Sequence, residues 1–330
     1  MTSAHATIEV FVPSKRLVLT VRAHAKVNLD LRVLGVRPDG YHELRTVFQS
    51  IELHDTLTCI EKPGPFLLSC RAPVVPLDSS NLIWKAAAAL WKALGRQGDV
   101  ADTVVRIEKH IPVEAGLGGG SADAAAALAA LTRLWGGVSP HRASVRRGDP
   151  ELWSLLREVG STIGADVPFF LSGGTALGLG RGEEIYPLVD LPRHFIAIVR
   201  PPFGVSTAEA YAWYDEDRSA GLREVREQQV LPVPWPSRAA QMVNDLEPPV
   251  SRRHPQIGAL KTQLKEGGAI AAAMSGSGSA VFGLFRSRLA AERTLKTVCR
   301  GGVRGLLTRT LTRAEYERRS RPVAVRRGSR

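Results

Sequence analysis

The chain has 330 residues, of which 44% are hydrophobic and 23% charged, and its formal net charge is +12. This length and composition are typical of a globular protein with two domains or one large one. No apolar run approaches the roughly 18 residues that a membrane helix needs, and charged residues and a proline interrupt the stretch where a signal peptide would be apolar. Three cysteines without a C-x-x-C pair favour neither a disulfide framework nor a zinc site. We therefore expect a cytoplasmic protein without a membrane partner.

The positive charge is concentrated near the C-terminus. Seven arginines against two glutamates give residues 313–330 a net charge of +5. We expect residues 1–17 to form a loose N-terminal extension and residues 313–330 to form a basic tail that buries little surface. The remaining positive charge is spread along the chain, which suits an enzyme of polyanionic substrates as well as an RNA-binding protein.

The first half of the chain predicts a mostly antiparallel sheet. Alternating and β-branched residues predict strands over 17–34 and 43–53, joined by a turn at Pro38-Asp39-Gly40. Shorter strands are expected over 55–61, 66–71 and 102–109, and a helix over 82–94 begins after Ser80-Asn81. Lys26 and Asn28 share one face of the first strand. Taken alone, Lys26 is better interpreted as a solvated strand lysine than as a functional residue.

The most informative stretch begins at Pro112. Within it, four of the five residues from 116 to 120 are glycine: Gly116, Gly118, Gly119 and Gly120. Such a loop allows close approach of the backbone to a ligand, and the Ala-rich sequence that follows predicts a helix capped by Ser121 or Asp123. A helix N-terminus after a glycine loop binds anions, most commonly phosphate. The alternative is a plain turn before a tightly packed helix. The loop lacks the Lys-Ser/Thr of a P-loop and the G-x-G-x-x-G spacing of a dinucleotide site.

Two further stretches are candidates for the same site. Asp166 lies between Gly164 and Pro168 and precedes an apolar run, an unusual place for a carboxylate without a partner; it could also be a helix cap or a turn residue. A second glycine cluster, over residues 273–282, leads directly into a strand and could be only a tight turn. Between them, residues 187–192 mark the expected domain boundary, and helices are expected after it from Thr207 and near Asn244.

Together these stretches resemble the GHMP kinase superfamily. Three family motifs match, over residues 25–31, 112–127 and 274–282, and the resemblance covers about residues 18–310. It implies an α+β fold with an N-terminal ribosomal-S5-like α/β domain (18–190) and a C-terminal ferredoxin-like domain (191–312). The implied reaction is ATP-dependent phosphorylation of a substrate hydroxyl, with ATP and Mg²⁺ as cofactors.

The run Arg37-Pro-Asp-Gly-Tyr-His-Glu-Leu44 resembles one branch of this superfamily. That branch phosphorylates the 2-hydroxyl of a cytidine diphosphate methylerythritol in the non-mevalonate isoprenoid precursor pathway. The resemblance therefore implies a small-molecule substrate, no nucleic-acid partner, and a monomer or homodimer. Another small-molecule kinase or a decarboxylase of the same fold is the alternative among enzymes of the superfamily. An RNA-binding protein, and a homologue that binds ligand without catalysis, are the alternatives of a different class.

The resemblance also implies roles for individual residues. The catalytic pair falls on Lys26 and Asp166, a carboxylate that can take the proton of the acceptor hydroxyl beside an ammonium that offsets charge on the transferring group. Substrate contacts fall on Asn28, Tyr41, His42, Ser275 and Gly276, with Tyr41 and His42 expected at the cytosine ring. ATP contacts fall on Pro112, Gly116, Leu117, Gly118, Gly119, Gly120, Ser121, Asn81 and Lys109. Ser121 is also the expected hydroxyl near Mg²⁺.

Overall fold

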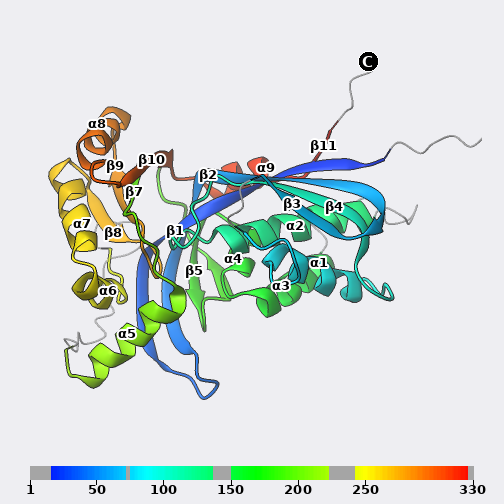
Figure 1. Ribbon diagram of the computed structural model, residues 1–330, viewed down its shortest axis with the longest axis horizontal. Helices are drawn as coiled ribbons and strands as arrows, with labels where there is room; N and C mark the ends of the chain where they lie inside the picture. Colours follow the sequence, from blue (N-terminus) through cyan, green and yellow to red (C-terminus); the bar gives the residue numbers. More distant parts are fainter. Residues whose placement is uncertain (1–15, 72–74, 137–149, 223–241, 326–330) are drawn as a thin grey trace, which may run out of the picture.

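The protein is built around two sheets, which lie side by side and are each accompanied by helices (Figure 1). The structure, a computed structural model, describes residues 16–71, 75–136, 150–222 and 242–325. Most of the expected N-terminal extension, residues 137–149 and the last five residues therefore lie outside the described residues. Among the helices that the structure describes, none combines the length and the apolar character needed to cross a bilayer.

The first sheet has the strand order β11-β1-β2-β4-β3, and β5 and β6 extend it from β2. Its two long strands, β1 (Val18–Val36) and β2 (His42–Pro65), pair antiparallel, as the alternating pattern predicts. The expected strands 43–53 and 55–61 are one continuous strand, because no glycine or proline separates them. The remaining members are β3 (Leu67–Cys70), β4 (Ala101–Glu108), β5 (Thr175–Leu179), β6 (Glu184–Pro187) and β11 (Val323–Ala324).

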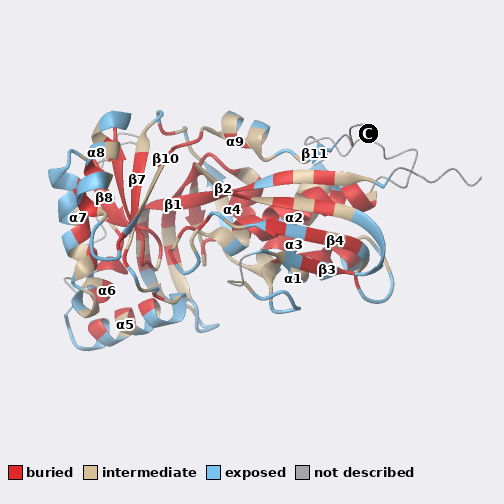
Figure 2. Ribbon diagram, turned by 45° about the horizontal axis from the view of Figure 1, so that its top comes forward, coloured by how far each residue is buried: buried red, intermediate tan, exposed pale blue. Residues whose placement is uncertain are grey.

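Four helices pack beside the first sheet: α1 (Leu82–Ala93), α2 (Gly119–Gly136), α3 (Pro150–Ile163) and α4 (Val167–Ser172). The small side chains of α2 are almost all buried, so this helix lies at the centre of the first core (Figure 2). Burial on every side explains why α2 is Ala-rich, since only small residues allow close packing on all faces.

The second sheet has the order β10-β7-β9-β8 and lies beyond residue 190. Its strands are β7 (Phe195–Arg200), β8 (Ala271–Met274), β9 (Val281–Phe285) and β10 (Arg304–Arg309). The accompanying helices are α5 (Thr207–Ser219), α6 (Glu247–Arg253), α7 (Gln256–Glu266) and α8 (Arg288–Val298). The division of the chain near residue 190 stays a proposal, since all four strands of the second sheet follow that residue but β11 of the first sheet does so too.

The far ends of β1 and β2 do not belong to the first core. Leu31 and Val33 of β1 and Leu44 of β2 are buried against helices and strands of the second half of the chain. The same two strands therefore enter both cores.

The expectation that residues 314–330 bury little surface is wrong for the part that the structure describes. Residues Arg313–Arg319 form helix α9, whose Tyr316 is only 3% exposed, and β11 pairs with β1. Thr312 and Glu315 form a capping box at the start of α9. The expectation rested on the number of arginines in this segment. It did not take into account that one aromatic residue and a helix cap are enough to dock the segment on the first sheet.

His24 of β1 is fully buried close to the rings of His54 and Tyr316. Burial, with help from His54, lowers the pKa of His24 from 6.5 to about 3. Between these values the unfolded chain binds a proton that the folded chain does not bind, so stability is complete above pH 6.5 and falls as the pH drops. We expect a loss of up to about 1.4 kcal/mol per pH unit below 6.5.

Urea unfolding at pH 7.5, 6.0 and 5.0 measures this loss. His24→Gln should flatten the pH dependence, whereas His194→Gln, at a histidine that is only partly buried, should leave the slope as it is. An unchanged slope in His24→Gln would contradict the assignment.

Candidate active site

A cleft of about 1210 Å³ lies where the first sheet, the glycine loop and helix α5 meet. All but one of the site residues expected from the sequence line this cleft. The residues that line it are Lys26, Asn28, Tyr41, His42, Asn81, Lys109, Pro112, Gly116, Leu117, Gly118, Gly119, Gly120, Ser121, Asp166 and Gly276. Ser275 is the exception, since its side chain is fully buried beneath the cleft. The fold thus gathers residues that lie up to 250 positions apart in the sequence.

Lys26 and Asp166 form an ion pair in this cleft, with Lys26 Nζ 3.4 Å from Asp166 Oδ2. The Lys26 side chain is 5% exposed, which excludes the solvated strand lysine, whereas the Asp166 side chain is 30% exposed. Asp166 occupies the N-cap position of α4, but its side chain makes no capping hydrogen bond. Its carboxylate therefore faces the cleft and the ammonium rather than the helix it precedes.

A chain of buried hydrogen bonds fixes the Lys26 ammonium. Lys26 Nζ donates to Asn28 Oδ1 at 2.6 Å and to the carbonyl oxygen of Gly116 at 3.0 Å. Asn28 Nδ2 donates to Thr46 Oγ1 at 2.8 Å, and the Thr46 hydroxyl donates to the Asp30 carbonyl at 2.7 Å. Because Thr46 uses its proton on Asp30, it must accept from Asn28, which turns the amide oxygen of Asn28 toward Lys26.

The glycine loop ends in helix α2, whose first turn faces the cleft. The amide of Ala122 donates to the carbonyl of Gly118, so the helix begins earlier than a cap at Ser121 or Asp123 would allow. That expectation is wrong: Ser121 lies inside the first turn of α2, and Asp123 lies just after that turn. Gly116 and Gly118 have φ angles of 68° and 71°, which only glycine adopts readily.

The second glycine cluster, residues 275–278, closes against the first. The Ser275 hydroxyl donates to the Gly116 carbonyl at 2.9 Å, the same oxygen that accepts from Lys26. A Cβ at Gly116 would overlap the Ser275 carbonyl. Ser275 therefore holds the first loop in place, and only its neighbours Gly276, Ser277 and Gly278 line the cleft.

Lys109 lies below the start of α2 in a buried charged cluster. Its ammonium contacts Asp55 Oδ2 at 2.5 Å and Asp123 Oδ2 at 2.8 Å. Burial raises the pKa of Asp123 despite this ammonium, and Asp123 Oδ1 is buried without a hydrogen-bond partner among the described residues.

Asn81 also lines the cleft, where it is the N-cap of α1. Its side-chain oxygen accepts from Ile83 N at 2.8 Å, and its amide nitrogen donates to the Pro76 carbonyl. The predicted capping role is confirmed, and the predicted ATP contact stays a prediction.

The other end of the cleft is aromatic. The ring of His42 stacks on that of Tyr211 from α5, with centroids 4.6 Å apart, and His42 Nε2 lies 2.9 Å from Asp215 Oδ1. Tyr41 is 58% exposed, and the Arg181 guanidinium lies over its ring. Burial, with a smaller contribution from the Asp166 carboxylate, raises the pKa of Tyr211, so this tyrosine is neutral near the Lys26–Asp166 pair.

Sequence reasoning missed several residues of this site: Thr46, Asp55, Asp123, Arg181, Tyr211 and Asp215. Asp123 and Thr46 lie within stretches that the sequence had singled out, and a search for polar residues on the Lys26 face would have included Thr46. Tyr211 and Asp215 gave a weaker signal, since their spacing of four places them on one face of a helix. Nothing in the sequence pairs that face with His42, 173 positions away from Asp215.

The fold and this site define a small-molecule kinase, and the chain belongs to the GHMP kinase family. Its residues 81–174 match the model of the GHMP kinases N terminal domain, and residues 235–304 match that of the GHMP kinases C terminal. A homoserine kinase from Cytophaga hutchinsonii, of known structure, shares the fold, with a TM-score of 0.61 and 17% identity over 97% of this chain and 100% of that one.

Curated relatives are more similar. The 4-diphosphocytidyl-2-C-methyl-D-erythritol kinase of Solibacter usitatus is 42% identical over 281 residues, 84% of each chain. That of Pelotomaculum thermopropionicum is 41% identical over 305 residues, 89% of this chain and 98% of the relative. A crystal structure of 4-(cytidine 5'-diphospho)-2C-methyl-D-erythritol kinase matches with a TM-score of 0.67 and 33% identity, over 88% of this chain and 98% of that one.

Proposed function

We propose that this kinase transfers the γ-phosphoryl group of ATP to the 2-hydroxyl of 4-diphosphocytidyl-2-C-methyl-D-erythritol, a step in the non-mevalonate isoprenoid precursor pathway. The observation that carries the proposal is the Lys26–Asp166 pair, which lies between a glycine loop and an aromatic subsite in one cleft. The names of the relatives support the choice of substrate.

The geometry of the pair supports a role in proton transfer. Asp166 takes the proton of the acceptor hydroxyl as a bond forms between that oxygen and the γ-phosphorus, and the bond from the γ-phosphorus to the β–γ bridging oxygen breaks as ADP leaves. Lys26 offsets negative charge on the transferring group. Because Asn28 and Gly116 fix the ammonium, it needs no reorganisation as that charge develops.

The first turn of α2 would hold the ATP phosphates, because its leading backbone N–H groups have no intrahelical partners and lie at the positive end of the helix dipole. Mg²⁺ commonly binds a kinase through one or two protein oxygens together with substrate phosphates. The Ser121 hydroxyl and Asp123 Oδ1, which has no hydrogen-bond partner within the described ranges, fit that requirement. When bound, the ion would neutralise charge on the phosphates.

The aromatic end of the cleft suits a pyrimidine ring. Tyr41 is largely exposed, with the Arg181 guanidinium over its ring, and Tyr211 and Asp215 fix the orientation of the His42 ring. Stacking on such rings recognises a base through its face, while hydrogen bonds to its edge distinguish one base from another. We therefore assign the cytosine to this end.

We expect His42→Ala to raise KM for the cytidine substrate about tenfold to a hundredfold, the value of one such contact. The contact is remote from the phosphoryl group, so kcat should change less. Steady-state kinetics and thermal unfolding of the same preparation measure both effects. A histidine that only closes the preceding turn would lower stability and leave KM at its wild-type value.

The proposed substrate is tested by incubating the protein and ATP with the cytidine diphosphate methylerythritol, with mevalonate or with homoserine, and identifying the products by mass spectrometry. We expect a phosphorylated product from the first compound alone. Phosphorylation of mevalonate or homoserine instead would assign the chain to another branch of the family.

A further inference from the structure

Helix α4 carries Asp166 into the cleft but is too short to hold its own position. It has six residues, and isolated helices shorter than about 12 residues are marginal in water. Its placement therefore depends on what packs around it. Phe169 is fully buried and stacks on Phe48, while the Phe170 ring lies where a Cβ on Gly118 would collide with it.

The C-terminal end of α4 rests on α9. The Tyr316 hydroxyl donates to the Phe170 carbonyl, one of the terminal carbonyls that a helix leaves without an internal partner. The Tyr316 ring covers Gly173, where an added Cβ would overlap it. Phe170 lies four positions after Asp166, about 6 Å along a helix axis, so Tyr316 fixes the far end of a short rigid unit whose near end is the catalytic carboxylate.

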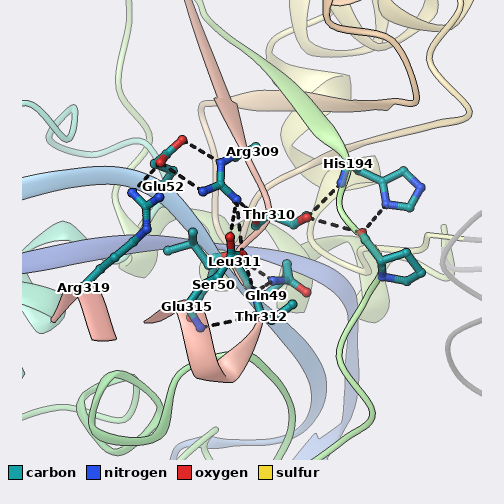
Figure 3. Close-up of polar contacts among 11 residues, drawn as sticks. Gln49, Ser50, Glu52, His194, Arg309, Thr310, Leu311, Thr312, Glu315 and Arg319 are labelled. Atoms are coloured by element: carbon teal, nitrogen blue, oxygen red, sulfur yellow. Dashed lines mark hydrogen bonds and ion pairs between the residues drawn. The ribbon is translucent and has the colours of Figure 1, made fainter. Parts of the chain in front are cut away.

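The segment that carries Tyr316 is anchored to the strand next to Lys26. Leu311 N donates to the Ser50 carbonyl at 2.9 Å, and Ser50 is the residue of β2 directly opposite Lys26. Gln49 Nε2 donates to the Leu311 carbonyl at 2.9 Å. These contacts lie in the centre of Figure 3.

Charged side chains reinforce the same junction. Arg309 and Arg319 both pair with Glu52 of β2, at 2.9 Å and 2.6 Å, and Arg309 also pairs with Glu315 of α9 (Figure 3). Arg309 is 6% exposed. Around the buried Arg309 the network is partly exposed, with the Glu52 side chain 34% exposed, and several ion pairs that share Glu52 and Arg309 restrict the geometry of the junction.

We propose that residues 309–319, the C-terminal brace, set the distance between Lys26 and Asp166, and that Tyr316 is a positioning residue for the phosphoryl transfer. The brace contacts the Lys26 side of the site through Ser50 and the Asp166 side through Phe170. The proposal rests on the proposed function, in which Asp166 accepts the proton.

The test removes one hydroxyl. Tyr316→Phe keeps the ring over Gly173 and deletes the hydrogen bond to Phe170. We expect kcat to fall about tenfold, because a displacement of less than 1 Å at a reacting group has effects of this size, with the KM for ATP and for the cytidine substrate within about twofold of wild type. Tyr186→Phe, which removes an exposed hydroxyl, and Val298→Ala, which destabilises the second core, serve as matched controls and should retain kcat.

A double-mutant cycle separates positioning from general loosening. If Tyr316 acts through Asp166, Tyr316→Phe should change kcat less than about twofold in the Asp166→Asn background. The proposal would be contradicted if Tyr316→Phe lowered kcat equally in both backgrounds. It would also be contradicted if the substitution changed KM alone or left kcat at the wild-type value. A failure of the proposed function would give different results. The wild-type protein would then be inactive on the cytidine substrate, or the Asp166→Asn variant would be fully active.

Hydrogen exchange gives a readout that needs no substrate. In Tyr316→Phe we expect faster exchange of the amides of Val167 and of residues 169–172 in α4, with exchange in α7 unchanged. If α4 exchanged at the wild-type rate, the brace would not hold it and the proposal would fall.

Discussion

Asp166→Asn should lower kcat roughly 10²- to 10⁴-fold while ATP binding stays nearly intact. The substitution keeps the shape of the side chain and its place before α4 but removes the only group within 4 Å of Lys26 Nζ that the structure describes as an ionic partner. The asparagine amide cannot take a proton from the acceptor hydroxyl, and the Lys26 ammonium then lacks its counter-charge.

Single-turnover kinetics at high enzyme concentration would measure this loss, and calorimetric titration with an ATP analogue would measure nucleotide affinity. Asp99→Asn, at an exposed surface aspartate, is the matched control and should behave as wild type. If Asp166→Asn kept kcat within about threefold of the wild-type value, Asp166 would not be the catalytic base.

Gly116→Ala should abolish most activity by a different route, because its effect is geometric. The residue has a φ of 68°, and an added Cβ would overlap the backbone carbonyl of Ser275, so the two glycine loops would have to separate. The Gly116 carbonyl would then lose the hydrogen bonds from Lys26 and Ser275 together. We expect kcat/KM to fall more than about a hundredfold, since a shift near 1 Å in a positioned group costs that much.

Gly98→Ala separates the overlap from the backbone strain. Gly98 has nearly the same φ, 70°, but nothing within 4 Å of its would-be Cβ. The Gly98→Ala variant should therefore lose only the stability that the left-handed conformation costs an alanine, about 1–2 kcal/mol. Its kcat and KM should equal those of the wild type. Equal activity in Gly116→Ala and Gly98→Ala would show that the loops do not need this close approach.

The sequence predicted the parts of the fold that local chemistry determines. Helix α1 begins after Asn81 as its cap requires, and the proline–glycine turn after Val36 joins two long strands. The glycine loop could be recognised because four closely spaced glycines are more than a plain turn needs and are typical of a loop whose backbone approaches a ligand. The cap of α2 was misplaced, because Gly118, which has no side chain to offer, takes the position that Ser121 or Asp123 was expected to fill.

Contacts between distant segments could not be predicted from the sequence. Ser275 was expected to touch substrate, and only the fold shows that its hydroxyl turns inward to Gly116. The docking of α9 likewise depends on Tyr316 meeting Gly173, 143 positions earlier in the chain. Such pairs depend on how two surfaces meet, which neither segment encodes alone.

The passage of β1 and β2 through both cores has a consequence for protein engineering. A fragment ending at residue 190 would present Leu31, Val33 and Leu44 to water and would lack residues 309–319, which hold α4. Exposing three such apolar side chains costs about 5 kcal/mol, comparable to the whole stability of many domains. The two halves are therefore not interchangeable modules, and a chimera with a family member would have to exchange the ends of β1 and β2 together with the second half.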